Sequence, residues 1–204
     1  MGRVRVGGGT DIGNFSVIGK PYRKIKGRRL RARPMTVLGR NCQIGANVTI
    51  MKGTHVRNRV AIDDHCYVEQ DVDIGGRTIL TYHAIVCNGA RIGDDCIIGG
   101  FIGERCRVGA DSRVFGSLVH RQDDPAADWD SLEEPAPVLG HHVLVGFGAV
   151  VIGDITVGPR SIIGAGALVT KKVAAGSIVT GKDKAVHHSE SDMTVAQSNW
   201  FRRK

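Results

Sequence analysis

Residues 117–140, SLVHRQDDPAADWDSLEEPAPVLG, contain the side chains best suited to chemistry. His120 opens the polar part of this stretch, and acids and prolines follow it. Histidine side chains have an unperturbed pKa near 6.5, so a neutral imidazole can accept a proton at cellular pH. His120 is therefore either a general base or a solvated loop residue. The other residues expected to contact a substrate here are Arg121, Asp123, Asp124 and Trp129.

Either Asp123 or Asp124 is a candidate to orient the imidazole of His120. Trp129 either anchors the loop or offers a stacking face to a substrate. The acidic run lacks the spacing of a calcium-binding loop.

The remaining chain must position these side chains, and it has a period of six residues. With three breaks of register allowed, a Leu, Ile or Val recurs at every sixth position. The fourth residue after each of them is nearly always small or a valine, with Leu118 and Ile155 as exceptions. Two inward positions per six residues fit neither a helical period of 3.6 nor a strand alternation of 2. The aliphatic positions are Val6, Ile12 and Ile18; every sixth residue from Leu38 to Ile98; Ile102, Val108 and Val114; and Leu139, Val145, Val151, Val157, Ile163 and Val169.

This period describes flat sides joined by corners, stacked at the strand spacing of roughly 4.8 Å. About seven coils account for the marked positions. Cys42, Cys66, Cys96 and Cys106 fall in the small inward slot, where a reduced thiol acts as a small hydrophobe. Five cysteines without a CxxC pair argue against a disulfide framework or a zinc ribbon.

His65 and His83 are eighteen residues apart, which is one coil, so the period predicts that they stack at one corner above Asn47. They are either accidental corner residues, contributors to a substrate site, or metal ligands. No metal is expected, and the adjacent histidines His141 and His142 have the wrong spacing for ligands of a shared ion.

The six-residue period is interrupted three times, and such interruptions mark positions where loops with a functional role can be inserted. The first is the basic segment 20–37, in which residues 20–33 carry eight Lys or Arg and no acid. The second, at 98–103, is a corner shortened by two residues, and the third is the insertion 120–138. The basic segment either binds the phosphates of a cofactor or of a nucleotide-linked substrate, or is a solvated loop or a contact between subunits. Nucleic acid is disfavoured because Tyr22 alone offers a stacking face.

Composition excludes several protein classes. The chain of 204 residues has 42% hydrophobic but only 5% aromatic residues, and its 28 glycines suit short strands and tight turns. Its formal charge of +8 favours anionic partners. Its apolar runs are shorter than the roughly 20 residues that span a bilayer, and the N-terminus lacks the apolar region of a signal peptide. We expect a soluble, cytoplasmic protein without a membrane partner.

From the third break onward, the sequence resembles the hexapeptide-repeat acyltransferases of the galactoside and xenobiotic O-acetyltransferase and nucleotide-amino-sugar N-acetyltransferase types. The resemblance rests on the loop histidine before PVLG at 137–140 and on GAGALVTKKV at 164–173. It implies an all-β fold, a left-handed parallel β-helix over residues 1–181. The chain departs from the family where VAAGSIVTGKDKAV replaces the usual proline-containing ending. Residues 182–204 are expected to form a tail, which Ser189 or Ser191 can cap as a short helix.

The resemblance also implies the chemistry. Family members transfer an acyl group, usually acetyl, from CoA directly to a hydroxyl or amine while a histidine removes the acceptor's proton. His120 is then the base, and the acceptor is a small molecule such as a sugar, nucleotide sugar or antibiotic. CoA lies between neighbouring β-helices of a homotrimer. The residues expected to line the CoA groove are Gly146, Gly164, Ala165, Thr170, Lys171 and Lys184.

Two other functions remain open from the sequence. One is a metalloprotein like the γ-class carbonic anhydrases, although their His-x4-His pair is missing here. The other is a trimeric binding scaffold without turnover.

Overall fold

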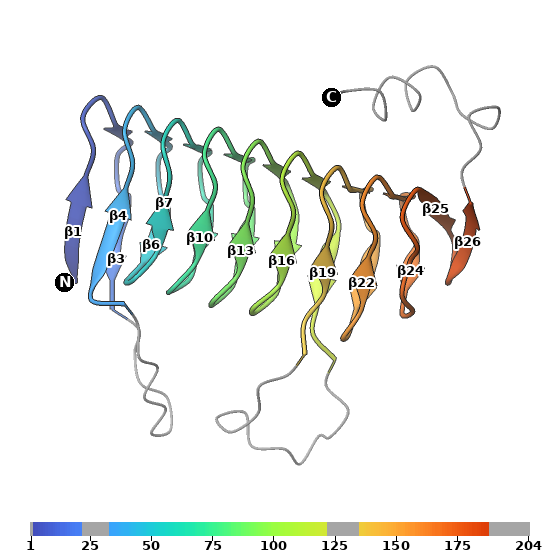
Figure 1. Ribbon diagram of the computed structural model, residues 1–204. Coiled ribbons are helices and arrows are strands. Elements are labelled where there is room, and N and C mark those ends of the chain that lie inside the picture. Colours follow the sequence, from blue (N-terminus) through green and yellow to red (C-terminus); the bar gives the residue numbers. More distant parts are fainter. Residues whose placement is uncertain (1, 22–32, 122–134, 188–204) are drawn as a thin grey trace, which may run out of the picture.

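The structure is a computed structural model that describes residues 2–21, 33–121 and 135–187. These residues form short strands that wind into a three-sided coil (Figure 1), and each side is a sheet. Sheet A contains β1 (Arg3–Val6), β4 (Met35–Leu38), β7 (His55–Val56), β10 (Asp73–Ile74), β13 (Arg91–Ile92), β16 (Arg107–Val108), β19 (Val138–Leu139) and β22 (Thr156–Val157). Sheet B contains β2 (Asp11–Ile12), β5 (Gln43–Ile44), β8 (Ala61–Ile62), β11 (Ile79–Leu80), β14 (Ile97–Ile98), β17 (Arg113–Val114), β20 (Leu144–Val145), β23 (Ile162–Ile163), β25 (Ser177–Thr180) and β26 (Lys184–His187). Sheet C contains β3 (Val17–Lys20), β6 (Thr49–Met51), β9 (Tyr67–Val68), β12 (Ile85–Val86), β15 (Phe101–Ile102), β18 (Ser117–Val119), β21 (Val150–Ile152) and β24 (Leu168–Val169).

From β1 to β24, successive strands visit sheets A, B and C in turn, and each pairs in parallel with the strand one coil away. In Figure 1 the near strands ascend and the chain returns behind them as the coils advance from left to right, which is a left-handed winding. The predicted fold class, a left-handed parallel β-helix, is confirmed. Eight strands in each of sheets A and C give eight coils rather than about seven. We name the corners the A–B, B–C and C–A edges after the sheets they join.

The predicted inward residues form the core. The aliphatic ladder from Leu38 to Val169 is buried, and so are the four cysteines of the small slot. Val6 and Ile12 are exceptions, with 44% and 41% of their surface exposed. They belong to the first coil, and β1 pairs only with β4, so only one side of this coil is covered.

The corners explain why polar residues recur there. The residue before each small slot commonly adopts a positive φ, as at Asn47 (55°), His65 (60°) and His83 (62°). This left-handed conformation is strained for most side chains, and Asn, Asp and His tolerate it better than most. Histidines at these positions therefore have a backbone role besides any chemical one.

The shortened corner at 98–103 is confirmed, because only Gly99 and Gly100 separate β14 from β15. A methyl group on Gly100 would overlap the carbonyl oxygen of Gly116. A second shortened corner, Phe115–Gly116, lies one coil further on between β17 and β18. This shortening explains why Leu118, a large residue, falls at a position where the period predicts a small one. Leu118 is instead a buried strand residue of β18.

Both insertions leave the coil at the C–A edge (Figure 1). The basic segment lies between Lys20, the last residue of β3, and Met35, where β4 begins, so the strand resumes three residues before the predicted boundary at 37. The other insertion lies between Val119 in β18 and Val138 in β19. Beyond Gly181, β26 pairs antiparallel with β25 and closes the end of sheet B. The possible helix after residue 187 lies outside the described residues.

In the described ranges, no helix has the length and apolar character needed to cross a bilayer.

Candidate functional site

The C–A edge brings His120 to the same side of the coil as the C-terminal family motif. His120 follows β18, Gly153 follows β21 and Thr170 follows β24, so these residues occupy three successive corners. At roughly 4.8 Å per coil, His120 lies about 10 Å from Thr170 along the axis. The His120 side chain is half-buried, and Arg121 packs its aliphatic carbons over Gly153, 3.5 Å from a Cβ placed there.

Thr170 is held in place by the turn that leads into β26. Its backbone N–H and its hydroxyl both donate to the Asp183 carboxylate, each at 2.6 Å. These hydrogen bonds lower the pKa of Asp183. Lys171 lies near this carboxylate, and both Lys171 and Lys184 are exposed, so the last coils present ammonium groups to solvent.

The B–C edge collects the other predicted residues. The rings of His65 and His83 are stacked, with centroids 5.3 Å apart and planes at 11°, as the period predicted. Tyr82 packs edge-on against His83 at 4.1 Å. Further along this edge, Phe115 and Phe147 stack at 4.7 Å.

The glycines predicted to contact CoA also lie at the B–C edge, where packing already requires them. A Cβ on Gly146 would lie 2.7 Å from the backbone nitrogen of Ala165 on the next coil. A Cβ on Gly164 would lie 3.2 Å from the Val179 carbonyl oxygen. Coil stacking thus accounts for both glycines without a ligand, while Ala165 is exposed beside them.

One chain does not bring the predicted site together. His120, Arg121, Thr170 and Lys171 lie at the C–A edge, whereas His65, His83, Gly146, Gly164 and Ala165 lie at the B–C edge. Sheet C separates these two edges. Asp123, Asp124, Trp129 and most of the basic segment, residues 22–32, lie outside the described residues.

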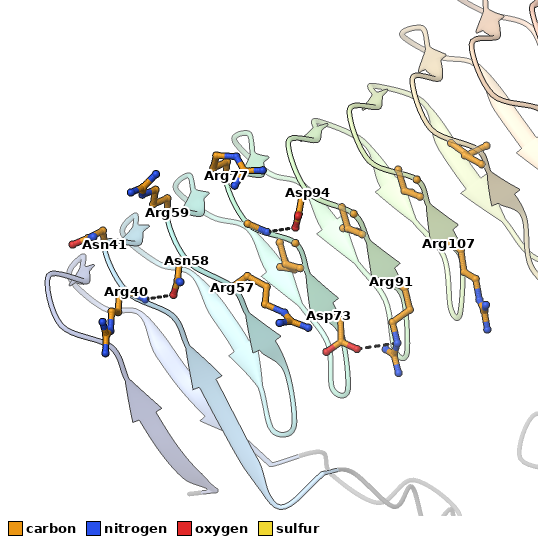
Figure 2. Close-up of a pocket in the computed structure, with 18 residues that line it drawn as sticks. Arg40, Asn41, Arg57, Asn58, Arg59, Asp73, Arg77, Arg91, Asp94 and Arg107 are labelled. Carbon is orange, nitrogen blue, oxygen red and sulfur yellow. Dashed lines mark hydrogen bonds and ion pairs between the residues drawn. The ribbon is translucent and has the colours of Figure 1, made fainter. Parts of the chain in front are cut away.

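A shallow cavity of about 970 Å³ on sheet A and the A–B edge holds residues that sequence reasoning missed (Figure 2). Two carboxylates, Asp73 and Asp94, and two amides, Asn41 and Asn58, lie among its glycines and aliphatic residues. Its basic residues are Arg40, Arg57, Arg59, Arg77, Arg91 and Arg107. Applying the coil length to charged residues would have revealed part of it, because Arg59 and Arg77 are eighteen residues apart.

The carboxylate of Asp73, on strand β10 in this cavity, is the negative charge that two nearby arginines share. It accepts hydrogen bonds from Arg33 at 2.7 Å and pairs with Arg91 at 2.9 Å. Arg33 also donates to Nδ1 of His55 at 2.9 Å. Burial, followed by the Arg33 charge, lowers the pKa of His55. Arg33, the last basic residue of the segment 20–37, thus holds the start of strand β4 against the next coils.

Buried polar groups occur elsewhere in the coil. Burial raises the pKa of the Cys66 and Cys96 thiols to about 11, and that of Cys87 and Cys106 to about 12. Gln70, at the C–A edge, is 2% exposed and its Nε2 has no hydrogen-bond partner.

Within the described part of the chain, no group of three His, Cys, Asp or Glu side chains is arranged to hold a metal ion.

Two segments of the chain match family models. Residues 136–171 match the bacterial transferase hexapeptide (six repeats), and residues 35–64 match the hexapeptide repeat of succinyl-transferase. These matches confirm the resemblance to hexapeptide-repeat proteins.

Curated relatives are similar over part of their length. The bifunctional protein GlmU of Synechococcus sp. (strain CC9605) is 26% identical over 180 residues, which are 71% of this chain and 40% of that protein. GlmU of Prochlorococcus marinus (strain MIT 9313) is 27% identical over 182 residues, 72% of this chain and 40% of that protein. The aligned region is therefore less than half of these relatives.

Solved structures are similar to this chain at low sequence identity. The UDP-N-acetylglucosamine O-acyltransferase (LpxA) of Moraxella catarrhalis RH4 has a TM-score of 0.48 and 15% identity, covering 92% of this chain and 72% of that chain. A hexapeptide-repeat acetyltransferase of Vibrio cholerae in complex with acetyl coenzyme A has a TM-score of 0.36 and 19% identity, covering 73% of this chain and 67% of that chain.

Proposed function

We propose that this protein is a CoA-dependent acyltransferase that transfers an acyl group, most simply acetyl, to a hydroxyl or amine of a small molecule such as a sugar, nucleotide sugar or antibiotic. The observation that carries the proposal is the position of His120. It stands where the coil leaves for the insertion, two corners from Thr170, and the chain that resumes after the insertion matches the transferase hexapeptide model over residues 136–171.

In this proposal His120 is the general base. Its imidazole takes the proton from the acceptor as the acceptor oxygen or nitrogen attacks the thioester carbonyl. The carbon–sulfur bond then breaks, and the proton held by His120 passes to the departing thiolate. Proton transfer by a positioned side chain contributes typically about 10²- to 10⁴-fold in rate.

Exposed lysines at the end of the coil suit the phosphates of acyl-CoA. Lys171, Lys172, Lys182 and Lys184 are all exposed around the turn that contains Asp183. An ammonium group binds phosphate as a point charge and needs no fixed geometry. These lysines are the described residues that would hold the nucleotide part of the co-substrate.

The proposed enzyme is a homotrimer whose copies complete one another's sites. Strand residues next to the buried ladder point outward, and on sheet C they are largely apolar. Ile79 and Ile85 are 41% and 39% exposed on sheets B and C, and Phe147 at the edge between them is 69% exposed. Exposed apolar surface of this kind favours burial against another copy. The outward residues of sheet C include Thr49, Tyr67, Ile85, Phe101, Val150 and Leu168.

Such an assembly also accounts for the separation of the predicted residues. If the B–C edge of one copy faces the C–A edge of the next with the coil axes parallel, Ala165 of one chain lies level with Thr170 of its neighbour, and His83 lies two coils from the level of His120. The site is then complete only between copies.

The test is acyl transfer by the purified protein. CoA thiol released from acetyl-CoA is measured against panels of sugars, nucleotide sugars and aminoglycosides, with the wild type compared with His120→Asn. We expect the variant to lose at least about 100-fold in kcat/KM. His141→Asn, which changes an exposed histidine at the A–B edge, is the matched control and retains activity. Full activity of His120→Asn would refute the base, and CoA binding without turnover in any panel would favour a binding scaffold.

A further inference from the structure

The arginine cavity on sheet A is not used by the proposed acyl transfer. Its lining comes from coils that begin at β4, β7, β10, β13 and β16, whereas His120 and Thr170 lie at the C–A edge after β18 and β24. We call it the arginine face, defined by Arg40, Arg57, Arg59, Arg77, Arg91 and Arg107.

Two of the six arginines of this face are already paired with carboxylates of the same chain. Asp95 pairs with Arg77 at 2.5 Å, and Asp73 pairs with both Arg33 and Arg91. Asp94 caps a corner by accepting a hydrogen bond from the Gly76 N–H at 2.6 Å. The structure therefore supplies partners for Arg77 and Arg91.

Four arginines of this face have no carboxylate partner among the described residues. Among the residues that the structure describes, no carboxylate pairs with Arg40, Arg57, Arg59 or Arg107, and all four side chains are exposed. Like charges repel, and arginine gains most from bidentate contact with a carboxylate or phosphate. This face therefore has a net positive field and free guanidinium donors.

Three of these four, Arg40, Arg57 and Arg107, are spread along the axis of the coil, and the paired Arg91 lies between Arg57 and Arg107. Figure 2 shows Arg40, Arg57, Arg91 and Arg107 in succession across neighbouring coils, with Asp73 between them. Four coil steps separate Arg40 from Arg107, which is about 19 Å at the strand spacing. A compact anion such as a single phosphate can contact only one end of this row, whereas a chain with repeated negative charges can contact both.

The other lining groups restrict the chemistry of such a chain. No aromatic side chain lines the cavity, so stacked nucleobases would find no partner. Two amides do line it, Asn41 and Asn58, and an amide can donate to and accept from hydroxyl groups. Alternating carboxylates and hydroxyls are what an acidic polysaccharide presents.

A second copy of the chain does not suit this face. The outward strand residues of sheet C include no carboxylate, and on sheet B Asp11 of the first coil is the single described one. Apart from Asp11, the strand residues of sheets B and C therefore supply no carboxylate to the arginines in a trimer built from the apolar faces.

We infer that the arginine face binds a linear acidic polysaccharide along the axis of the β-helix, holding its carboxylates with Arg40, Arg57 and Arg59 at one end and Arg107 at the other. Binding here is independent of acyl transfer, because none of these residues belongs to the proposed catalytic edge.

The test is fluorescence anisotropy with a labelled oligogalacturonate long enough to span about 20 Å. Binding should weaken as salt rises, and free galacturonic acid should not displace the probe. The double variant Arg57→Gln/Arg107→Gln should raise Kd by at least about tenfold, since hydrogen bonds to charged groups are lost at both ends. The double variant Arg3→Gln/Arg160→Gln removes the same charge from exposed positions outside the cavity and should change Kd little.

Three results would overturn the inference. Equal weakening by the two double variants would mean that net charge alone attracts the probe. Tighter binding of inorganic polyphosphate or single-stranded DNA of matched charge would show that the ligand is not a saccharide. No binding by the folded wild type, with circular dichroism unchanged, would mean that the face has no such role. All four substituted positions are exposed, so folding is expected to survive each change.

Discussion

The open first coil gives a matched pair of substitutions, Val6→Ala and Val56→Ala. Both valines occupy the inward position of sheet A, and both are in register with Leu38. Val56 lies between Leu38 and Ile74 and is 2% exposed, whereas Val6 is covered from one side and is 44% exposed. Intrinsic strand preference is the same for both changes, so the difference in stability reports packing alone.

The magnitudes follow from burial. Each substitution removes two carbon groups, worth about 1.6 kcal/mol of transfer free energy when they are fully buried. Val56→Ala also leaves a cavity between two coils, so we expect a loss of about 2–3 kcal/mol in the free energy of unfolding. About half of the transfer contribution applies at Val6, and no enclosed cavity forms, so we expect a loss below about 1 kcal/mol.

Urea unfolding followed by circular dichroism measures the difference, with the slope m checked for each variant because coils can unfold separately. If the two losses agree within about 0.5 kcal/mol, the claim that the first coil is covered on one side is wrong.

Three further predictions concern polar side chains of the coil. Gln70→Met removes an amide whose Nε2 has no partner and keeps the side-chain length, so it should stabilise the protein by about 1–2 kcal/mol in thermal unfolding, and a loss of stability would contradict the assignment. The pKa of His55 is lowered in the fold, so its contribution to stability is present above the unfolded pKa of about 6.5 and is lost as pH falls through the lower folded pKa. His55→Gln, which can still accept from Arg33, should flatten the fall in stability between neutral and mildly acidic pH, and an unchanged slope would exclude this histidine. Burial raises the pKa of Cys96 to about 11, so a thiol reagent at pH 8 should label it only after unfolding, and rapid labelling of the native protein would contradict its placement.

Much of the coil could be predicted from the sequence, because the period of six is a local property. Each inward residue stacks on a residue of the same kind one coil away, so spacing along the chain translates directly into contact. The stacking of His65 on His83 and the burial of the four cysteines follow from this rule. Both insertions were visible as interruptions of the same period.

The remaining features of the fold and of the candidate site could not be predicted from the period, because they depend on which edge of the coil each corner occupies. A corner shortened at Phe115–Gly116 moves Leu118 into a strand, and nothing in the spacing distinguishes that change from an irregular small slot. The edges also decide which candidates meet: His120 shares an edge with Thr170 but is separated by sheet C from His65 and Ala165.

The sequence by itself determined the repeat, the core and the residue types available for chemistry, since these need only the distance between neighbours in the chain. The tertiary structure alone decided which charges are free. Arg91 and Arg77 carry the same charge as Arg57 and Arg107, yet carboxylates neutralise the first two. Pairing depends on side chains that coils bring together across sixteen or more residues, and that distance is set by winding and shortened corners rather than by local preference.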